Sequence, residues 1–338
     1  MASRLTTFGN DLYTGKRSFN FVGGRRKWYA IAGVLIILSI LVPAVRGINF
    51  GIEFRGGSQF QITNVADATS DPATEAVAQV VPDTVARVTI VGENGVRVQT
   101  DQLADAESRE LAVALAEAYD VPASEVTSSF IGPSWGADVT RQAVVGLIVF
   151  LALAMLIMAL YFRTWKMSLA AIIALIGDLI VTVGVYAGVG FEVSPAAMIG
   201  ILTILSYSLY DTVVVFDKVR ENTAEDGEES RRTFAESVNL AVNQTLVRSI
   251  NTSVVAALPV AAILFIGAGV LGADTLRDIS LALLVGIVVG TWSTVFIAAP
   301  LYSQLREGEA EITRHDQKVL KERERAAAVR GDEEIAPA

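Results

Sequence analysis

Three ionisable side chains lie within or beside long apolar runs of this sequence. Asp211 lies near the end of the apolar run 195–216. Asp178 interrupts the run before it, and Arg248 opens the run after it. A charged side chain in the middle of a bilayer costs about 2.5–3.5 kcal/mol on insertion scales, so such residues are functional candidates by default. Two carboxylates and one guanidinium predict a proton or ion relay and not an ordinary enzyme pocket.

Further polar side chains accompany these residues on the predicted helices. Helical spacing places Thr203 and Tyr207 on one face with Asp211, and the four supporting polar residues that we expect beside Asp211 or Arg248 are Tyr207, Ser208, Asn251 and Thr252. Asp211 and Arg248 both lie toward the expected cytoplasmic ends of helices that run antiparallel across one loop. We therefore expect these two residues at comparable depth and close enough to pair.

A structural role is the alternative for each residue. Asp211 and Arg248 would then form only a stabilising ion pair, or Arg248 would extend to the membrane interface. Asp178 would make a helix–helix hydrogen bond. The last apolar run has hydroxyl side chains within 291–294 beside a Gly-x-x-x-Gly pattern at 286–290. That pattern is typical of close helix packing, so we expect these hydroxyls to pack and not to carry chemistry.

The elements that hold these residues are predicted to be membrane-spanning helices. The chain has 338 residues, is 52% hydrophobic and has a mean hydropathy of +0.47, as integral membrane proteins do. A span needs about 20 mostly apolar residues. The six segments that qualify are about 28–46, 141–162, 167–187, 195–216, 246–267 and 279–301. The first lacks an A-x-A cleavage pattern, so we expect an uncleaved anchor.

The distribution of lysine and arginine predicts the orientation. Residues 1–27 have six of them against one acid, whereas residues 47–138 have four arginines, no lysine and fourteen acids. Because cytoplasmic segments are enriched in these cations, both termini are expected in the cytoplasm. The expected organisation is a cytoplasmic segment 1–27, transmembrane helix 28–46, extracytoplasmic domain 47–138, five-helix bundle 139–302 with a cytoplasmic loop 217–245, and charged cytoplasmic tail 303–338.

The segment 47–138 has the pattern of a small α+β domain. Alternating apolar residues predict strands, and a cap-proline pair and an apolar face predict helices. The expected elements in order are strand 58–64, helix 73–81, strand 86–90, strand 96–98, helix 104–119 and strand 125–131. The order strand–helix–strand–strand–helix–strand predicts a ferredoxin-like arrangement. Such a fold by itself says nothing about function.

Four other segments have readable patterns. The glycine-rich segment 47–57 is expected to be a hinge or tight connection, with Gly51, Gly56 and Gly57 as its hinge residues. The acidic stretch 225–229 predicts an exposed linker, and 231–243 predicts an amphipathic helix on the membrane surface. The tail from about 303 is expected to be partly helical at most, then disordered.

Composition excludes several classes of function. The net charge of −9 and the acidic outer segment argue against nucleic-acid binding, which needs a basic face. Cysteine is absent and the single histidine, His315, lies in the charged tail where we expect it to be solvated. No metal site and no cofactor are therefore expected. No Walker-type phosphate loop occurs, so ATP is not the expected energy source.

An intramembrane aspartyl protease also needs two aspartates in spans. Such enzymes have Tyr-Asp first and Gly-x-Gly-Asp second. Here the Gly-Asp pair at 177–178 precedes the Tyr-Asp pair at 210–211, and Leu175 stands where a glycine is needed. The sequence therefore does not predict an enzyme.

Three stretches between Trp28 and about Tyr302 resemble the SecF family of protein-export membrane proteins in the resistance–nodulation–division superfamily. The segment 47–57, GINFGIEFRGG, resembles the G-I-D-F-x-G-G signature of that family. The stretch 206–222, which begins SYSLYDTVVVFD, resembles its G-Y-S-x-N-D-T-V-V-V-F-D-R-x-R-E-N block, and 246–253 resembles its R-[ST]-x-x-T-S motif. The middle block is long and highly specific.

The resemblance implies six spans, a small extracytoplasmic domain and a place in the bacterial cytoplasmic membrane. The implied partners are SecD, the SecYEG channel, a translocating unfolded polypeptide and membrane lipid. The implied energy source is the proton motive force, although some relatives use Na⁺. Asp211 and Arg248 match the membrane-embedded pair of the family, and Asp178 matches a less diagnostic His-Asp position. Tyr210 and Gly177 replace an asparagine and a histidine, which removes two polar neighbours.

Two other functions remain open at this point. A half-transporter of the same superfamily would export a small molecule or a lipid, but it would normally have two repeats with large outer domains in one chain. A subunit that only assembles partners would have no ion coupling. Full export with a neutralised Asp211 would favour that second possibility.

Overall fold

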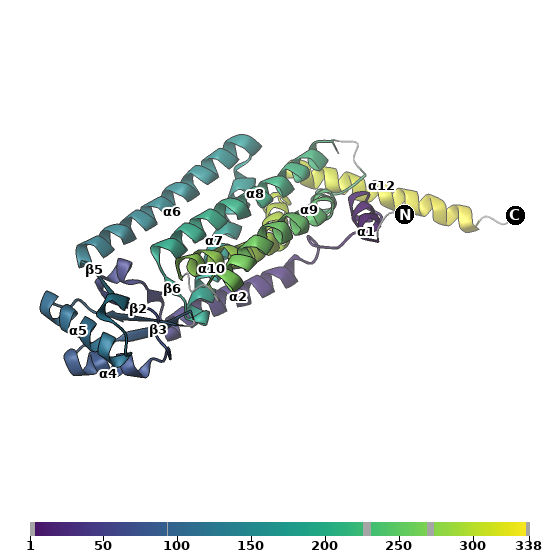
Figure 1. Ribbon diagram of the computed structural model, residues 1–338. Coiled ribbons are helices and arrows are strands. Elements are labelled where there is room, and N and C mark those ends of the chain that lie inside the picture. The colour runs from purple at the N-terminus through teal and green to yellow at the C-terminus, as the bar shows by residue number, and fades with distance from the viewer. Residues whose placement is uncertain (1–3, 93, 226–230, 269–273, 336–338) are drawn as a thin grey trace.

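The computed structural model describes residues 4–92, 94–225, 231–268 and 274–335 as a helical bundle with a small sheet domain at one end (Figure 1). In these ranges, six helices are long and apolar enough to cross a membrane, as predicted. The spanning helices are α2 (Arg25–Arg46), α6 (Pro133–Phe162), α7 (Trp165–Val189), α8 (Pro195–Glu225), α9 (Phe234–Ala262) and α10 (Asp274–Ser293). The π-helical turns η2 (Ile263–Ala268) and η3 (Thr294–Ala298) continue α9 and α10, and η3 leads into α11 (Ala299–Arg306).

Two spanning helices are longer than the apolar runs that predicted them. α8 continues to Glu225, and α9 begins at Phe234 and not near 246. Both flanking helices therefore extend into the segment 217–245, whose assignment as a cytoplasmic loop stays a prediction. The predicted acidic linker lies, after Glu225, outside the described residues.

The amphipathic helix predicted at 231–243 is the first part of α9 and not a separate surface helix. Its apolar residues are buried against the bundle: Phe234, Val238 and Val242. Thr233 caps this helix, since its hydroxyl accepts a hydrogen bond from the Glu236 amide at 3.3 Å. The Glu236 carboxylate accepts one in return from the Thr233 amide at 2.9 Å. The apolar face of this segment continues along the same side of α9 into the span, so it packs against the other helices and not on the membrane surface.

The sheet domain follows the predicted order of elements. These are β2 (Gly57–Ile62), α4 (Asp71–Val80), β3 (Arg87–Val91), β4 (Gly95–Thr100), α5 (Asp105–Ala118), the short turn η1 (Ala123–Glu125) and β5 (Val126–Ile131). All strands pair antiparallel in the order β3-β4-β2-β5. The alternating residues Phe60, Ile62, Val96 and Val98 are buried in one core with Leu111 and Leu115. The element order is confirmed, whereas the ferredoxin-like assignment stays a prediction.

The glycine-rich segment between α2 and the sheet domain is held against the bundle. Its elements are β1 (Asn49–Phe50), which pairs in parallel with β6 (Glu192–Val193), and the single turn α3 (Ile52–Arg55). Gly56 and Gly57 have φ angles of 77° and 138°, a region that favours glycine. Gly51 has a φ of −61°, which any residue adopts, so backbone conformation does not explain a glycine at this position. A hinge role for these glycines stays a prediction.

The C-terminal tail is helical. α12 (Ala310–Ile335) lies near α1 (Arg4–Tyr13) at the end of the bundle far from the sheet domain, and its last turns project beyond the bundle (Figure 1). The prediction of a partly helical, then disordered tail is therefore wrong from Ala310 to Ile335. Ile312 and Val319 are buried, so this highly charged helix still makes an apolar contact with the rest of the protein.

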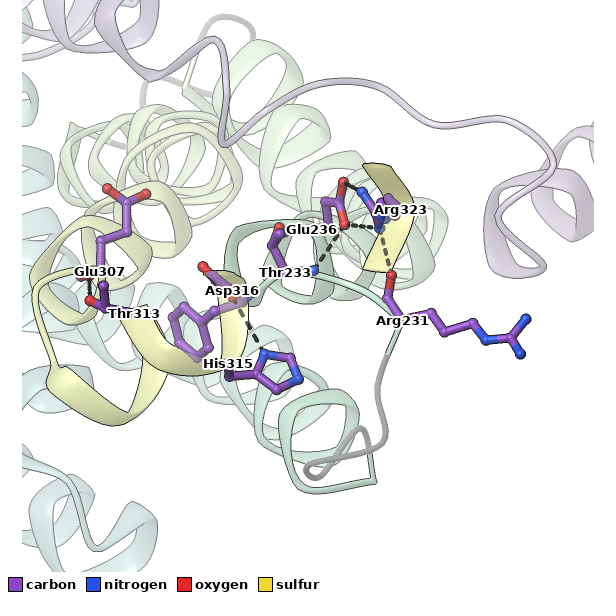
Figure 2. A network of polar contacts seen from close by, with 9 residues as sticks. Arg231, Thr233, Glu236, Glu307, Thr313, His315, Asp316 and Arg323 are labelled. Carbon is purple, nitrogen blue, oxygen red and sulfur yellow. Dashed lines mark hydrogen bonds and ion pairs between the residues drawn. The ribbon is translucent and has the colours of Figure 1, made fainter. Parts of the chain in front are cut away.

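Polar contacts join α12 to the start of α9 (Figure 2). The Arg323 guanidinium donates to the Glu236 carboxylate at 2.7 and 2.8 Å. Asp316 accepts a hydrogen bond from the Phe234 amide at 2.8 Å. His315, predicted to be solvated, is half-buried with Nδ1 3.5 Å from the Asp316 carboxylate. The tail is thus docked on the cytoplasmic end predicted for α9.

Close packing of α8 on α10 depends on glycine. A methyl group at Gly286 would overlap the Ile204 side chain, and one at Gly290 would lie 2.8 Å from Ser208. We expect Gly286→Ala to lower the free energy of unfolding by about 1–3 kcal/mol, because overpacked cores strain. Thermal unfolding in detergent measures this. Gly146→Ala on α6, with no atom within 4 Å of the added methyl, is the matched control. Equal melting temperatures for the two variants would contradict the prediction.

Candidate ion-coupling site

Asp178 of α7 and Asp211 of α8 are buried within the bundle, with 3% and 4% of their surface exposed. Ser208 donates a hydrogen bond from Oγ to Asp178 Oδ2 at 2.7 Å. Ser249 of α9 donates from Oγ to Asp211 Oδ1 at 2.8 Å. Because Ser208 and Asp211 are both on α8, the two carboxylates link three helices through one shared helix.

One oxygen of each carboxylate has no donor. Asp178 Oδ1 and Asp211 Oδ2 are buried and without a hydrogen-bond partner among the described residues, as is the hydroxyl of Tyr207 one turn before Asp211. A buried charge without a partner costs free energy, and adding a proton removes that charge. A proton on either carboxyl group would therefore be accommodated at these two oxygens, and a coupling role for the two aspartates stays a prediction.

Asp211 and Arg248 lie farther from their helix ends than predicted. α8 continues 14 residues beyond Asp211, and α9 begins 14 residues before Arg248. At 1.5 Å per residue, each residue lies about 21 Å from the end of its helix. The equal offsets on antiparallel neighbours agree with the expected comparable depth, although neither residue is near a helix end.

The structure does not bring Arg248 and Asp211 together as an ion pair. Arg248 is exposed, and Nη2 makes a long contact of 3.5 Å with the hydroxyl of Tyr210, which is 57% exposed. Successive residues on a helix point about 100° apart. Ser249 takes the inward position toward Asp211, so Arg248 points away from it.

Other polar side chains share this outward direction. We call them the polar strip: Thr203, Ser206, Tyr210, Arg248, Asn251 and Thr252, all exposed. Asn251 and Thr252 lie beside Arg248 as predicted, but they do not reach either carboxylate. The Thr252 hydroxyl bonds the backbone oxygen of Arg248 in its own helix at 3.0 Å. Of the four predicted supporting residues, Ser208 contacts Asp178, and Tyr207 has the buried hydroxyl described above.

Sequence reasoning missed Ser249, Thr212 and the role of the hydroxyls on the last span. Thr212 of α8 shares a hydrogen bond of 2.8 Å with Thr294 of η3, and both are buried. The Ser293 hydroxyl, also buried, donates to the Gly290 backbone oxygen of its own helix at 3.1 Å. One signal could have found Ser249: Thr245, Ser249 and Ser253 form a hydroxyl row at helical spacing on α9. The last span therefore contributes polar contacts as well as packing.

A groove of about 490 Å³ opens beside this site. It is lined by Val214 of α8 and by Thr245 and Arg248 of α9, among others. Val214 and Thr245 are each about one helical turn from Asp211 and Ser249, respectively. Asp211 itself is not among the residues that line the groove, whereas Tyr13 of α1 is.

Two family models match the chain. One, described as the C-terminal region of the protein export membrane proteins SecD and SecF, matches residues 112–308. The other, described as the SecD/SecF GG motif, matches residues 42–63. The first match contains both buried aspartates, and the second contains the glycine-rich segment.

Known proteins and solved structures agree with the family models. The protein translocase subunit SecF of Streptomyces coelicolor is 44% identical over 326 residues, which cover 96% of this chain and 87% of that protein. SecF of Mycobacterium tuberculosis is 40% identical over 328 residues, covering 94% and 74%. The crystal structure of SecDF, a translocon-associated membrane protein from Thermus thermophilus, has a TM-score of 0.75 at 30% identity. This match covers 86% of this chain and 39% of that longer one.

Proposed function

Because the chain belongs to the SecD/SecF family of protein-export membrane proteins, we propose that it works as the SecF-type subunit of the Sec machinery. In this role it acts with SecD beside the SecYEG channel and uses the proton motive force. The work done is to drive or complete the translocation of unfolded proteins across the bacterial cytoplasmic membrane. The observation that carries the proposal is the pair of buried carboxylates, each with one oxygen that has no donor.

Proton uptake at Asp211 would change the hydrogen bonds that stabilise the observed arrangement of the helices. The charged carboxylate accepts the Ser249 hydroxyl, whereas the protonated form also needs an acceptor for its own O–H. A proton that crosses a potential of 100 mV delivers about 2.3 kcal/mol. That energy is sufficient to shift a two-state equilibrium between helix arrangements by about fiftyfold. Asp178 on the adjoining helix would respond through Ser208.

The polar strip supports SecD as the neighbour of α8 and α9. Its six polar residues are exposed on helices that are long and apolar enough to cross a membrane. Polar groups at membrane depth face a bundle interior or a partner and not lipid tails. Arg248 makes no ion pair within the described ranges, so its counter-charge would come from a carboxylate on a SecD span.

The orientation follows from the cation distribution. All six lysines lie on the side of the membrane predicted for both termini, and 47–138 has none. The sheet domain would then lie outside, and the α1 and α12 end in the cytoplasm. The domain limits proposed from the sequence keep 47–138 as the outer unit and 139–302 as the five-helix bundle, although α6 already begins at Pro133.

Export in inverted membrane vesicles tests the proposal. Completion of translocation of a secretory precursor is measured with the proton gradient intact and after a protonophore collapses it. We expect the gradient-dependent step to need this chain together with SecD, and replacing Na⁺ by K⁺ separates proton from sodium coupling. The same gradient dependence in vesicles that lack the chain would instead favour a subunit without ion coupling. The half-transporter is not favoured, since relatives at 40–44% identity are named protein translocase subunits.

A further inference from the structure

The turn between α7 and α8 joins the two helices that hold the buried aspartates. We call residues 190–194 the coupling turn. Its backbone is bound to the segment that leads to the sheet domain, because β6 pairs with β1. Gly51 donates its amide to the Val193 oxygen at 3.1 Å. Asn49 donates from Nδ2 to the Gly190 oxygen at 2.9 Å.

One side chain of the coupling turn reaches the sheet domain directly. Glu192 Oε1 accepts a hydrogen bond from Gln99 Nε2 at 2.7 Å, and Oε2 lies 3.5 Å from Arg97 Nη1. Gln99 and Arg97 are both on β4, a central strand of the sheet. The Glu192 and Arg97 side chains are only 18% and 17% exposed, so this contact is partly shielded from water.

A second carboxylate lies beside this contact. Glu53 of α3 has a buried Oε2 without a hydrogen-bond partner among the described residues. A methyl group on Gly51 would overlap the Glu53 carboxylate and lie 2.9 Å from Glu192 Oε1. A glycine at 51 therefore leaves both carboxylates where they lie, whereas a side chain there would displace them.

The other side of the coupling turn is fixed to the bundle. Ser194 donates from Oγ to Asp278 Oδ2 of α10 at 2.7 Å, and the Tyr186 hydroxyl donates to the Asp278 backbone oxygen. The Arg277 guanidinium lies over the Phe191 ring, 4.0 Å from its centroid. A displacement of α7, α8 or α10 must therefore move the coupling turn.

We propose that Glu192 is the positioning residue that transmits rearrangement of the aspartate-bearing helices to the outer sheet domain. The chain enters the sheet domain through Gly56 and Gly57 and leaves it from β5 through Gly132 into α6. The carboxylate of Glu192 adds a polar contact between a bundle turn and a rigid central strand. This inference rests on the proposed function, since the rearrangement it transmits is driven by proton uptake.

The charge of Glu53 makes the same region sensitive to pH. Burial raises the pKa of Glu53, the nearby Glu192 raises it further, and Arg97 acts in the opposite direction. A raised pKa means that the folded chain binds this proton more tightly than the unfolded chain. Stability from Glu53 is thus present at low pH and is lost as pH rises from its ordinary pKa through the raised one.

We therefore expect Glu53→Gln to weaken the decline of melting temperature as the pH rises above the ordinary glutamate pKa of about 4.3. Thermal unfolding of the full chain in detergent at increasing pH measures the effect. Glu110→Gln, at an exposed acid of α5, is the matched control and keeps the decline. A decline that is the same in Glu53→Gln as in the unmodified chain would show that Glu53 is not buried as a charge.

Distances in the full complex with SecD test the role of Glu192. The chain has no cysteine, so spin labels can be attached at Val45→Cys on α2 and Val113→Cys on α5, both exposed positions. Asp211→Asn serves as the proton-loaded state. We expect the label distance to shift on Asp211→Asn, and Glu192→Ala to remove most of that shift. The double variant Glu192→Arg with Arg97→Glu restores an ion pair across the same gap and is expected to restore the shift.

A shift that persists in Glu192→Ala, or no shift on Asp211→Asn in the otherwise unmodified complex, would overturn the proposal. Glu110→Gln is again the control, and the shift should persist in it. Export in vesicles is measured on the same variants, and the gradient-dependent step should fall at least severalfold in Glu192→Ala. If the unmodified complex shows no gradient dependence, the proposed function fails, and the distances still decide whether Glu192 links the two parts.

Discussion

Asp211→Asn is expected to reduce the gradient-dependent step of export to the level seen without a proton gradient. Asparagine has nearly the size of aspartate, and its side-chain oxygen can still accept the Ser249 hydroxyl. It cannot take up or release a proton near neutral pH. The variant therefore keeps the helix contact and removes only the proton chemistry, which is the distinction the assay needs.

The Asp211→Asn experiment needs two controls. Asp138→Asn changes an exposed acid at the start of α6 and should leave the gradient-dependent step unchanged. Co-purification of the variant with SecD shows that the complex still assembles. If Asp211→Asn exports normally with a gradient, Asp211 is a structural polar residue, and Asp178 or an acid of SecD would have to take its place.

Arg248→Ala is expected to weaken the complex with SecD strongly while leaving the separate chain as stable as before. In the chain itself Arg248 is exposed and makes only a long contact with Tyr210, so truncation costs little. In the complex, an opposing carboxylate would be left buried without its cation, which costs about 3–5 kcal/mol. Arg248→Lys keeps the charge but loses the planar guanidinium, so its complex with SecD should be weaker than that of the unmodified chain and stronger than that of Arg248→Ala.

Two measurements decide the Arg248 prediction. Thermal unfolding of the separate chain in detergent should give the same melting temperature with and without Arg248→Ala. Retention of SecD during purification should drop in the variant and stay intact in Arg26→Ala, which removes another exposed arginine. If Arg248→Ala lowered the melting temperature of the separate chain as well as the retention of SecD, the partner of Arg248 would lie within this chain.

The spans and the outer domain could be predicted because each rests on a local pattern. The apolar runs exceed the length of a span, and Phe60, Ile62, Val96 and Val98 alternate as half-buried strands do. Helix ends were predicted less well. α8 and α9 continue past their apolar runs because Phe216, Val219, Val238 and Val242 are buried by other helices and not by lipid. A hydropathy pattern cannot distinguish these two kinds of burial.

The candidate site could be predicted in part for the same reason. Asp178 and Asp211 are recognisable because a charge in an apolar run is rare and costly. The partners of these residues depend on the rotation of each helix about its axis, which tertiary packing sets. A rotation that places Ser249 inward turns Arg248 outward, and no local signal of the sequence fixes that choice. The length of the α12 helix was missed because apolar residues such as the buried Ile312 and Val319 are few among many charges.

If the bundle is driven by protons as proposed, the number of carboxylates that carry them limits the mechanical work of one cycle. If both Asp178 and Asp211 carried a proton across 100 mV, about 4.6 kcal/mol would be released. Fixing the backbone of one residue costs about 1–2 kcal/mol, so this energy offsets the ordering of only about two to four residues. A secretory protein of several hundred residues would therefore be advanced or held by many small strokes, and export rate would scale with how often the bundle cycles.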